Sequence, residues 1–267
     1  MKKQIFTFVL SVSCIHAAGQ AVGQEKDALA SARVHFKERC ASAGERITKT
    51  VGDVDGVLLL KLRSERLNLS DQFILDDPYG SDYLGEGYIK SFLQAHHALP
   101  GHINRVEGRT ALPQKNVGYR FVDAVDPADG ERYRYTAFIE QPGLADPAFS
   151  LRHFRVVLER TPAPALPPRY GVRHDDISTT EDRRHWIAGS SLKVIDLRTG
   201  EVIAERIGYM FDPGLGNDSG GRSPWLMAAA HACPAFGGRH PAQSQGGQTV
   251  RFVEKVLLPR RTSQHGR

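Results

Sequence analysis

The sequence has few cysteines, few tryptophans and no long apolar run, and each scarcity excludes a class of protein. Its 267 residues include only 3 cysteines and 2 tryptophans, which excludes a small scaffold held together by many disulfides. No stretch reaches the roughly 20 consecutive apolar residues that a membrane-spanning helix needs. The formal net charge of +5 is too small to indicate a nucleic-acid-binding protein. We therefore expect no nucleic-acid partner, no membrane span and one sizeable core.

The first residues are typical of an export signal. Two lysines precede the short apolar run Ile5–Val12, and small residues follow. We interpret residues 1–24 as a signal peptide and predict a soluble, periplasmic mature chain. The alternative is a lipid anchor at Cys14, although Leu10 lies one position further from that cysteine than a lipid-attachment motif requires.

The remaining cysteines form an even pair. Outside the predicted signal peptide only Cys40 and Cys233 are present. In an oxidising compartment such a pair predicts a disulfide, which would close nearly the whole chain into one loop. On the loop-entropy model, this closure stabilises the fold by about 4–5 kcal/mol. The alternative is two buried thiols that never meet.

Two hairpins organise the predicted sheet. The central hairpin runs from Trp186 to Phe211 and turns at Asp196–Glu201, and an earlier one turns at Asp126–Glu131. Both turns follow the pattern D-x-x-(T/D)-G-E, in which glycine supplies the left-handed backbone angle of the return. Two copies are too few for a β-propeller, which needs about four blades. We expect the same turn chemistry to be used twice in one antiparallel sheet.

Apolar patterning predicts the other elements. Predicted helices are 25–43, 88–98, 223–232 and 250–258. The segment 47–63 is expected to form strands with a turn at 53–56, and 150–161 is expected to form a further strand. The proline-rich stretch 162–168 is expected to be a rigid crossover within one sheet. Ser178 is the expected cap of a short helix, with Glu181 completing a capping box. The predicted Gly-, Gln- and His-rich loop 237–247 is expected to be disordered.

These elements predict an α+β fold. We expect a single domain over residues 25–258, built on a mainly antiparallel sheet with an N-terminal helix and a C-terminal helix. Residues 259–267 are expected to form a disordered tail, because this end of the chain is polar and basic.

An acidic loop at Asp76–Gly87 is the main candidate for binding. Its four carboxylates and three glycines suggest Ca²⁺, but their spacing does not match an EF-hand loop. The neighbouring histidines His96, His97 and His102 lack the spacing of a zinc site, so we predict no metal. Tyrosines amid polar residues are typical of a protein-binding surface. The candidate binding residues are Tyr79, Asp82, Tyr83 and, from a later loop, Trp225.

One stretch invites a catalytic interpretation. Residues 216–221 contain D-S-G-G and residues 228–233 contain A-A-A-H-A-C, fragments that resemble the serine and histidine motifs of chymotrypsin-like proteases. Ser219 would be the nucleophile and His231 the base. In that family, however, the histidine motif precedes the serine motif, whereas here it follows. We therefore expect no catalytic residues and no cofactor, with a periplasmic serine hydrolase as the alternative.

Several segments together carry a resemblance that covers most of the chain. They are residues 44–47 with 54–60, 76–80, 187–196 and 221–226. In these segments the chain resembles a group of uncharacterised exported proteins of proteobacteria, some of which sit near type VI secretion phospholipase toxins. The resemblance implies an immunity protein, which would bind and neutralise a toxin in the periplasm without catalysing a reaction. A structural envelope protein is a further alternative.

Overall fold

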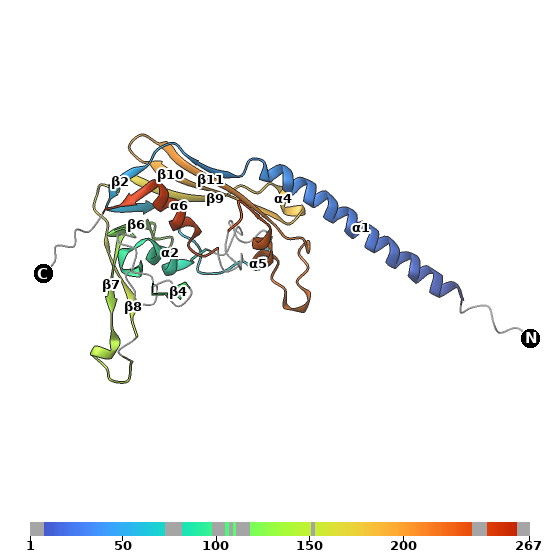
Figure 1. The fold of residues 1–267 in the computed structure, drawn as a ribbon, viewed down its shortest axis with the longest axis horizontal. Helices are drawn as coiled ribbons and strands as arrows, with labels where there is room; N and C mark the ends of the chain where they lie inside the picture. Colours follow the sequence, from blue (N-terminus) through green and yellow to red (C-terminus); the bar gives the residue numbers. More distant parts are fainter. Residues whose placement is uncertain are drawn as a thin grey trace, which may run out of the picture.

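A mixed sheet of nine strands forms the centre of the fold (Figure 1). The computed structural model describes residues 8–72, 82–97, 105–106, 109–110, 118–150, 153–236 and 245–260. In the first helix, side chains are described from residue 24 onward. The predictions for Tyr79, for His102, for the side chain of Cys14 and for most of the acidic loop therefore lie outside the described residues.

The elements are as follows. The α-helices are α1 (Phe8–Cys40), α2 (Gly85–Phe92), α3 (Gln94–His97), α4 (Thr180–Arg184), α5 (Pro224–Ala228) and α6 (Gln248–Val256). Short 3-10 turns are η2 (Pro142–Leu144), η3 (Ser219–Gly221) and η4 (Ala229–His231). The strands are β1 (Gly44–Ile47), β2 (Val51–Val54), β3 (Gly56–Leu59), β4 (Arg105–Val106), β5 (Arg109–Thr110), β6 (Phe121–Val125), β7 (Arg132–Glu140), β8 (Arg155–Pro162), β9 (Tyr170–Asp176), β10 (Ile187–Asp196), β11 (Glu201–Phe211), β12 (Ala232–Cys233) and β13 (Leu257–Pro259).

The main sheet has the order β1-β11-β10-β9-β3-β6-β7-β8, and β12 pairs with β11. Its pairs are antiparallel except that β3 runs parallel to both of its neighbours, β6 and β9. All four residues of β3 are buried, as the continuous apolar run 57–60 predicts for a strand covered on both faces. The predicted α+β fold on a mainly antiparallel sheet, with an N-terminal and a C-terminal helix, is confirmed.

Both predicted hairpins are present, and their turns use the same contacts. In the central hairpin, the Gly200 N–H donates to the Asp196 carbonyl over 2.8 Å, and β10 pairs with β11 on either side. In the earlier hairpin, the Gly130 N–H donates to the Asp126 carbonyl over 2.8 Å, and β6 pairs with β7. Both glycines have φ of +75°, which explains why the pattern requires glycine there. The proline-rich stretch links β8 to β9 within the same sheet, as expected.

Helices cover both faces of the central hairpin (Figure 1). Ile187 and its odd-numbered neighbours pack against Ala32 and Phe36 of α1. The alternate face packs against Trp225 of α5, and further along the sheet against α2 and α6. Because side chains alternate along a strand, the two apolar clusters lie on opposite sides of one ribbon. The core therefore surrounds β10 and β11.

Five local predictions need correction. Helix α1 is continuous from Phe8 and does not begin at residue 25. The cap of α4 is Thr179, with Asp182 as the reciprocal partner, because the Ser178 hydroxyl instead accepts the Gly189 N–H. Helix α6 ends at Val256, and the next residues form β13 parallel to β2. Residues 245–247, which were expected to be disordered, and residues 259–260 of the expected tail are placed in the fold.

Candidate functional site

Asp82 is a buried anchor for helix α6. Its side chain is 4% exposed. The carboxylate accepts the backbone N–H of Gly247 over 2.6 Å and that of Thr249 over 3.0 Å, together with the Thr249 hydroxyl over 2.5 Å. These donors belong to the first turn of α6, where unpaired backbone N–H groups attract a carboxylate. The guanidinium of Arg63 lies 3.7 Å away and balances its charge. Asp82 therefore makes its contacts within the fold.

Tyr83 is the exposed member of the predicted binding set among the described residues. Its side chain is 38% exposed, and its ring packs edge-on against His96 with the centroids 5.9 Å apart. The ring also lies over the backbone at Gly246 and Gly247, next to the start of α6. Tyr83 as a partner contact stays a prediction.

Trp225 is part of the core and only 2% exposed. Its indole N–H donates to the Asp71 carbonyl over 2.9 Å, and its ring lies 5.0 Å from that of Trp186. It also packs with Ala188 and Met210 beneath the central hairpin. In the sequence, Trp225 is a candidate binding residue because it follows a glycine-rich loop. In the fold, its ring is covered by other residues of the same chain.

The predicted disulfide is present. Cys40 at the end of α1 is bonded to Cys233 in β12, with the two Cα atoms 5.6 Å apart. Because β12 pairs with β11, the bond fastens α1 to the central hairpin. Next to it, the rings of Phe36 and Phe211 stack with centroids 5.5 Å apart. The disulfide and the apolar contact therefore hold the same helix on the same face.

The D-S-G-G loop has a structural explanation. Asp212 is fully buried and accepts the N–H groups of Gly214 and Gly216 over 3.1 and 2.9 Å. Arg222 pairs with the same carboxylate, and this bond raises the pKa of its guanidinium. These contacts fold the loop back on itself and hold the glycines in tight turns. No local pattern predicts this ion pair, because its partners lie at the two ends of the loop.

Ser219 and His231, the candidate catalytic pair, lie at separate exposed positions. The Ser219 backbone N–H donates to the Asn217 side chain over 2.9 Å. The His231 ring faces Phe211, with centroids 6.5 Å apart, beside the disulfide. In the part of the chain that the structure describes, no hydrogen bond joins Ser219 to His231.

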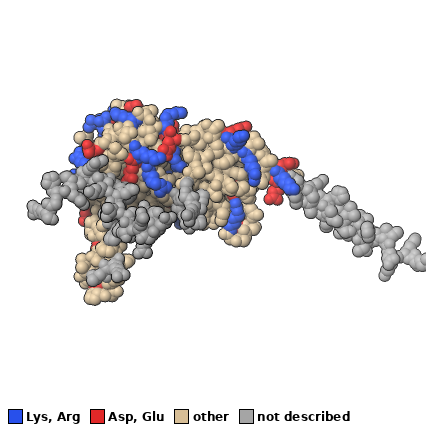
Figure 2. All heavy atoms as spheres, viewed as in Figure 1, with Lys and Arg blue, Asp and Glu red and all other residues tan. Residues whose placement is uncertain are grey.

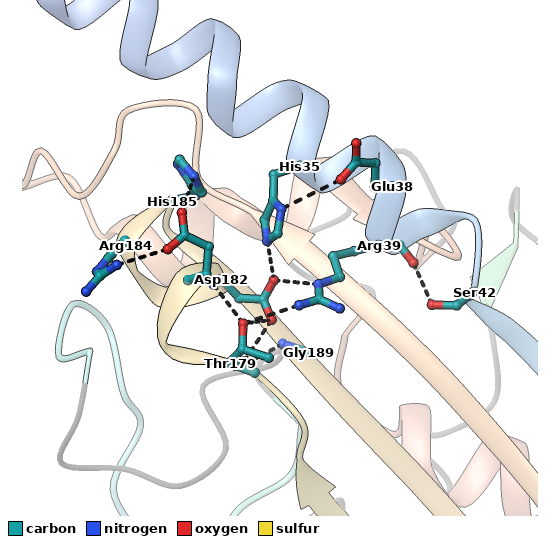
Figure 3. Close-up of polar contacts among 11 residues, drawn as sticks. His35, Glu38, Arg39, Ser42, Thr179, Asp182, Arg184, His185 and Gly189 are labelled. Atoms are coloured by element: carbon teal, nitrogen blue, oxygen red, sulfur yellow. Dashed lines mark hydrogen bonds and ion pairs between the residues drawn. The ribbon is translucent and has the colours of Figure 1, made fainter.

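A polar cluster clasps α1 to α4 (Figure 3). The buried Asp182 carboxylate accepts from His35 Nε2 over 2.8 Å, from Arg39 Nε over 2.7 Å and from the Thr179 hydroxyl over 2.8 Å. Burial alone would raise the pKa of Asp182, but the hydrogen bonds from Thr179, Arg39 and His35 outweigh it and lower the pKa. The ring of His185 lies 5.3 Å from that of His35. Every oxygen of the carboxylate is used, so the cluster is a structural tie between two helices.

No metal centre or membrane helix is found in the described parts of the molecule. Within them, no group of three or more His, Cys, Asp or Glu side chains is arranged to hold a metal ion. Within the same residues, no helix combines the length and the apolar character that crossing a membrane requires.

One set of exposed apolar side chains, which the sequence did not predict, lies on hairpin β7–β8. Hairpin β7–β8 extends away from the rest of the fold (Figure 1) and shows mainly uncharged side chains in Figure 2. Its end, which we call the hairpin tip, comprises residues 141–150. Leu144 in the tip is 77% exposed and Phe149 is 48% exposed, and nearby Phe138 and Ile139 on β7 are 45% and 36% exposed. In the sequence, Leu144 directly follows the Pro142-Gly143 pair, and Phe149 lies five residues further on.

Comparison of the chain with protein-family models, with curated proteins and with solved structures finds no match in any of the three.

Proposed function

We propose that this is an exported, non-enzymatic binding protein that holds a protein partner through the hairpin tip. The observation that carries the proposal is that Leu144 and Phe149 are both exposed at the end of a projecting hairpin, whose strand β7 also exposes Phe138 on one face and Ile139 on the other. Grouped apolar side chains on a surface mark interaction sites more often than scattered ones do. Large apolar and aromatic residues that enter a pocket contribute most of the binding free energy at protein interfaces.

The disulfide supports the exported location. Bonds such as Cys40–Cys233 form and persist in oxidising compartments and are rare where thiols are kept reduced. The charged start and the short apolar run of residues 1–24 support the same location. In a proteobacterium this compartment is the periplasm. The resemblance to exported proteins near phospholipase toxins then favours a secreted antibacterial toxin as the partner.

The internal contacts of the polar residues support a role without catalysis. Asp82 anchors α6, Asp212 organises the D-S-G-G loop, and Asp182 clasps two helices. Each of these buried carboxylates is occupied by donors from its own chain. An immunity protein needs only a surface that fits its toxin, and the hairpin tip offers such a surface.

The test is protection against the toxin encoded beside the gene. The toxin is directed to the periplasm of a sensitive strain with the wild-type protein or with the double variant Leu144→Asp/Phe149→Asp. We expect the wild type to restore growth and the tip variant to fail, because a buried carboxylate opposes docking. Leu166→Asp is the matched control, since Leu166 is 83% exposed in the proline-rich connector, away from the tip.

Two results would contradict the proposal. Failure of the wild type to protect or to form a complex would exclude the immunity role, and protection by the tip variant would exclude the tip. Esterase and peptidase screens of the wild type and Ser219→Ala address the enzyme alternative. Turnover that Ser219→Ala abolishes would exclude the non-enzymatic role.

A further inference from the structure

Strand β8 presents one edge that no described strand pairs with. It lies at one end of the sheet order, with β7 on its other side. The Ala163 N–H donates to the Arg132 carbonyl over 3.0 Å, in register with the β7–β8 ladder. Because hydrogen-bonded and non-hydrogen-bonded pairs alternate in an antiparallel ladder, the odd-numbered residues of β8 bond to β7. The backbone groups of Val156, Leu158 and Arg160 therefore point away from β7.

We propose that β8 pairs antiparallel with β8 of a second copy, with the two Val157 residues opposite each other. A two-fold axis then passes through this pair, so every contact is made twice. The outward-pointing backbone groups of Val156 bond to those of Leu158 in the partner subunit. Val157 falls at a non-hydrogen-bonded pair, which matches the alternation set by β7.

The charges of β8 are self-complementary in this register. Arg155 lies opposite Glu159 of the partner subunit, twice, and both positions are non-hydrogen-bonded pairs, in which side chains approach most closely. Within one chain, Arg155 Nε already lies 2.5 Å from Glu140 Oε2, and Glu159 lies beside Thr136. The dimer would therefore form an alternating polar row across four strands. Charges usually prevent edge pairing, but here they favour pairing with a copy of the same strand.

Apolar side chains complete the match on both faces. Phe138, 45% exposed, lies opposite Val157 in the β7–β8 register and on the same outward face. Pairing extends this into a continuous apolar row from one Phe138 to the other. On the opposite face, Ile139 neighbours Val156, which would meet Leu158 of the partner subunit.

Neighbouring registers lack this match. The next register with the same hydrogen-bond phase places the two Leu158 residues opposite each other, which puts Arg155 against Thr161 and Val157 against Glu159. The register in the other direction, centred on Val156, puts Arg155 against Val157. Charged side chains would then face uncharged ones in both cases, so the register centred on Val157 is the one we assign.

The dimer goes beyond the proposed function and does not depend on it. An antiparallel pair sends the two hairpin tips to opposite ends of the assembly, and Leu144 and Phe149 lie outside the paired strands. A monomer could still bind a toxin through its tip, and a dimer could lack any toxin.

The first test is the mass of the disulfide-bonded full-length gene product in solution, measured by sedimentation equilibrium over a range of concentrations. We expect a dimer. Glu159→Arg and Arg155→Glu should each weaken dimerisation by about tenfold or more, because each places like charges opposite each other twice. An equimolar mixture of the two variants should regain the dimer, since Arg then faces Glu in both pairs. Glu201→Arg, the same charge change on the exposed turn of the central hairpin, should leave dimerisation unchanged.

A cysteine pair then tests the register. Val157→Cys should form an intermolecular disulfide under mild oxidation, because the two positions face each other. Thr161→Cys is the matched control on the same face of β8, and it should not cross-link, because the two positions lie far apart along the antiparallel strands. A chain that is monomeric at every concentration would overturn the proposal. This holds even if the edge of β8 pairs with a strand of another protein, because the proposed partner is a second copy of this chain. So would a Glu159→Arg dimer as tight as the wild type.

Discussion

The central hairpin β10–β11 and the projecting hairpin β7–β8 belong to one sheet but differ in what covers them. In the central hairpin, β10 has eight of its ten residues buried, with α1 on one face and α5 and α6 on the other. In the projecting hairpin, β8 has no fully buried residue, and its far end carries exposed Leu144 and Phe149. Both ribbons contain apolar residues. Strand formation therefore does not distinguish a covered ribbon from an exposed one in this protein; helix cover does.

From this difference in helix cover, we expect the central hairpin to contribute to folding stability and the projecting hairpin to contribute to partner binding. A ribbon packed on both faces contributes to the free energy of folding through buried apolar area. A ribbon with exposed apolar side chains contributes little to folding and can bury that area against a partner instead. If this division holds, substitutions in the two hairpins should affect different measurements, and the following experiments compare them.

Removing the disulfide should have the largest effect on stability. The bond joins residues 193 positions apart and holds α1 over the central hairpin. The double variant Cys40→Ser/Cys233→Ser should lose about 5 kcal/mol of unfolding free energy on the loop-entropy model. Urea unfolding followed by circular dichroism measures the loss, and the reduced wild type is the control. An unchanged midpoint would show that the disulfide does not add to the stability of the packed α1 and central hairpin.

A matched pair of isoleucines compares the hairpins directly. Ile187 of β10 is fully buried under α1, whereas Ile139 of β7 is 36% exposed. Ile187→Ala should cost about 2–5 kcal/mol of unfolding free energy, because it removes buried methyl groups and leaves a cavity. Ile139→Ala should cost about 1 kcal/mol or less, because that site is partly solvated. Equal losses in urea unfolding would remove the distinction between the two hairpins.

The buried His174 and the partly buried Glu254 should change the unfolding free energy in opposite directions as the pH changes. Burial lowers the pKa of His174 on β9 from 6.5 to about 2, so its contribution to stability is lost as the pH falls below 6.5. Burial raises the pKa of Glu254 on α6 from 4.5 to about 7, so its contribution is lost as the pH rises above 4.5. Between pH 4.5 and 6.5 the two effects have opposite signs and largely cancel.

Single variants should reveal each slope. In this window, His174→Gln should become less stable as the pH rises, and Glu254→Gln should become more stable, each by up to about 1.4 kcal/mol per pH unit. Unfolding in urea at several pH values gives both slopes, with the double variant as the control that restores a flat profile. Parallel curves for all four proteins would mean that neither group titrates differently on folding.

The features that the sequence could predict are those that depend on residues close together in the chain or on a simple residue count. Gly130 and Gly200 are required by contacts within a single turn. The hairpins β6–β7 and β10–β11 were therefore predictable from the local pattern. The disulfide followed from the count of two cysteines and needed no geometry. The burial of Trp225 depends on Asp71 and Trp186, which are distant in the sequence, so no local pattern reports it.

Whether a strand is covered by helices depends on residues that are distant in the sequence, so it is the hardest feature to predict locally. β8 and the central strands all contain apolar residues, and the placement of α1, α5 and α6 decides which ribbon is enclosed. The cap of α4 illustrates the same limit on a small scale. Ser178 and Thr179 are both good caps, and the choice between them depends on the Gly189 N–H, which occupies the serine.

The smallest expected change in stability is also the sharpest test of the comparison. Leu144→Ser/Phe149→Ser should alter the unfolding free energy by less than about 0.5 kcal/mol, because both side chains are largely exposed in the folded chain. The same variant should lose partner binding, measured by calorimetry with the purified toxin, because the apolar anchors are gone. A variant that unfolds early would place the tip within the core and not on a binding surface. A stable variant that binds as well as the wild type would leave the projecting hairpin with neither role.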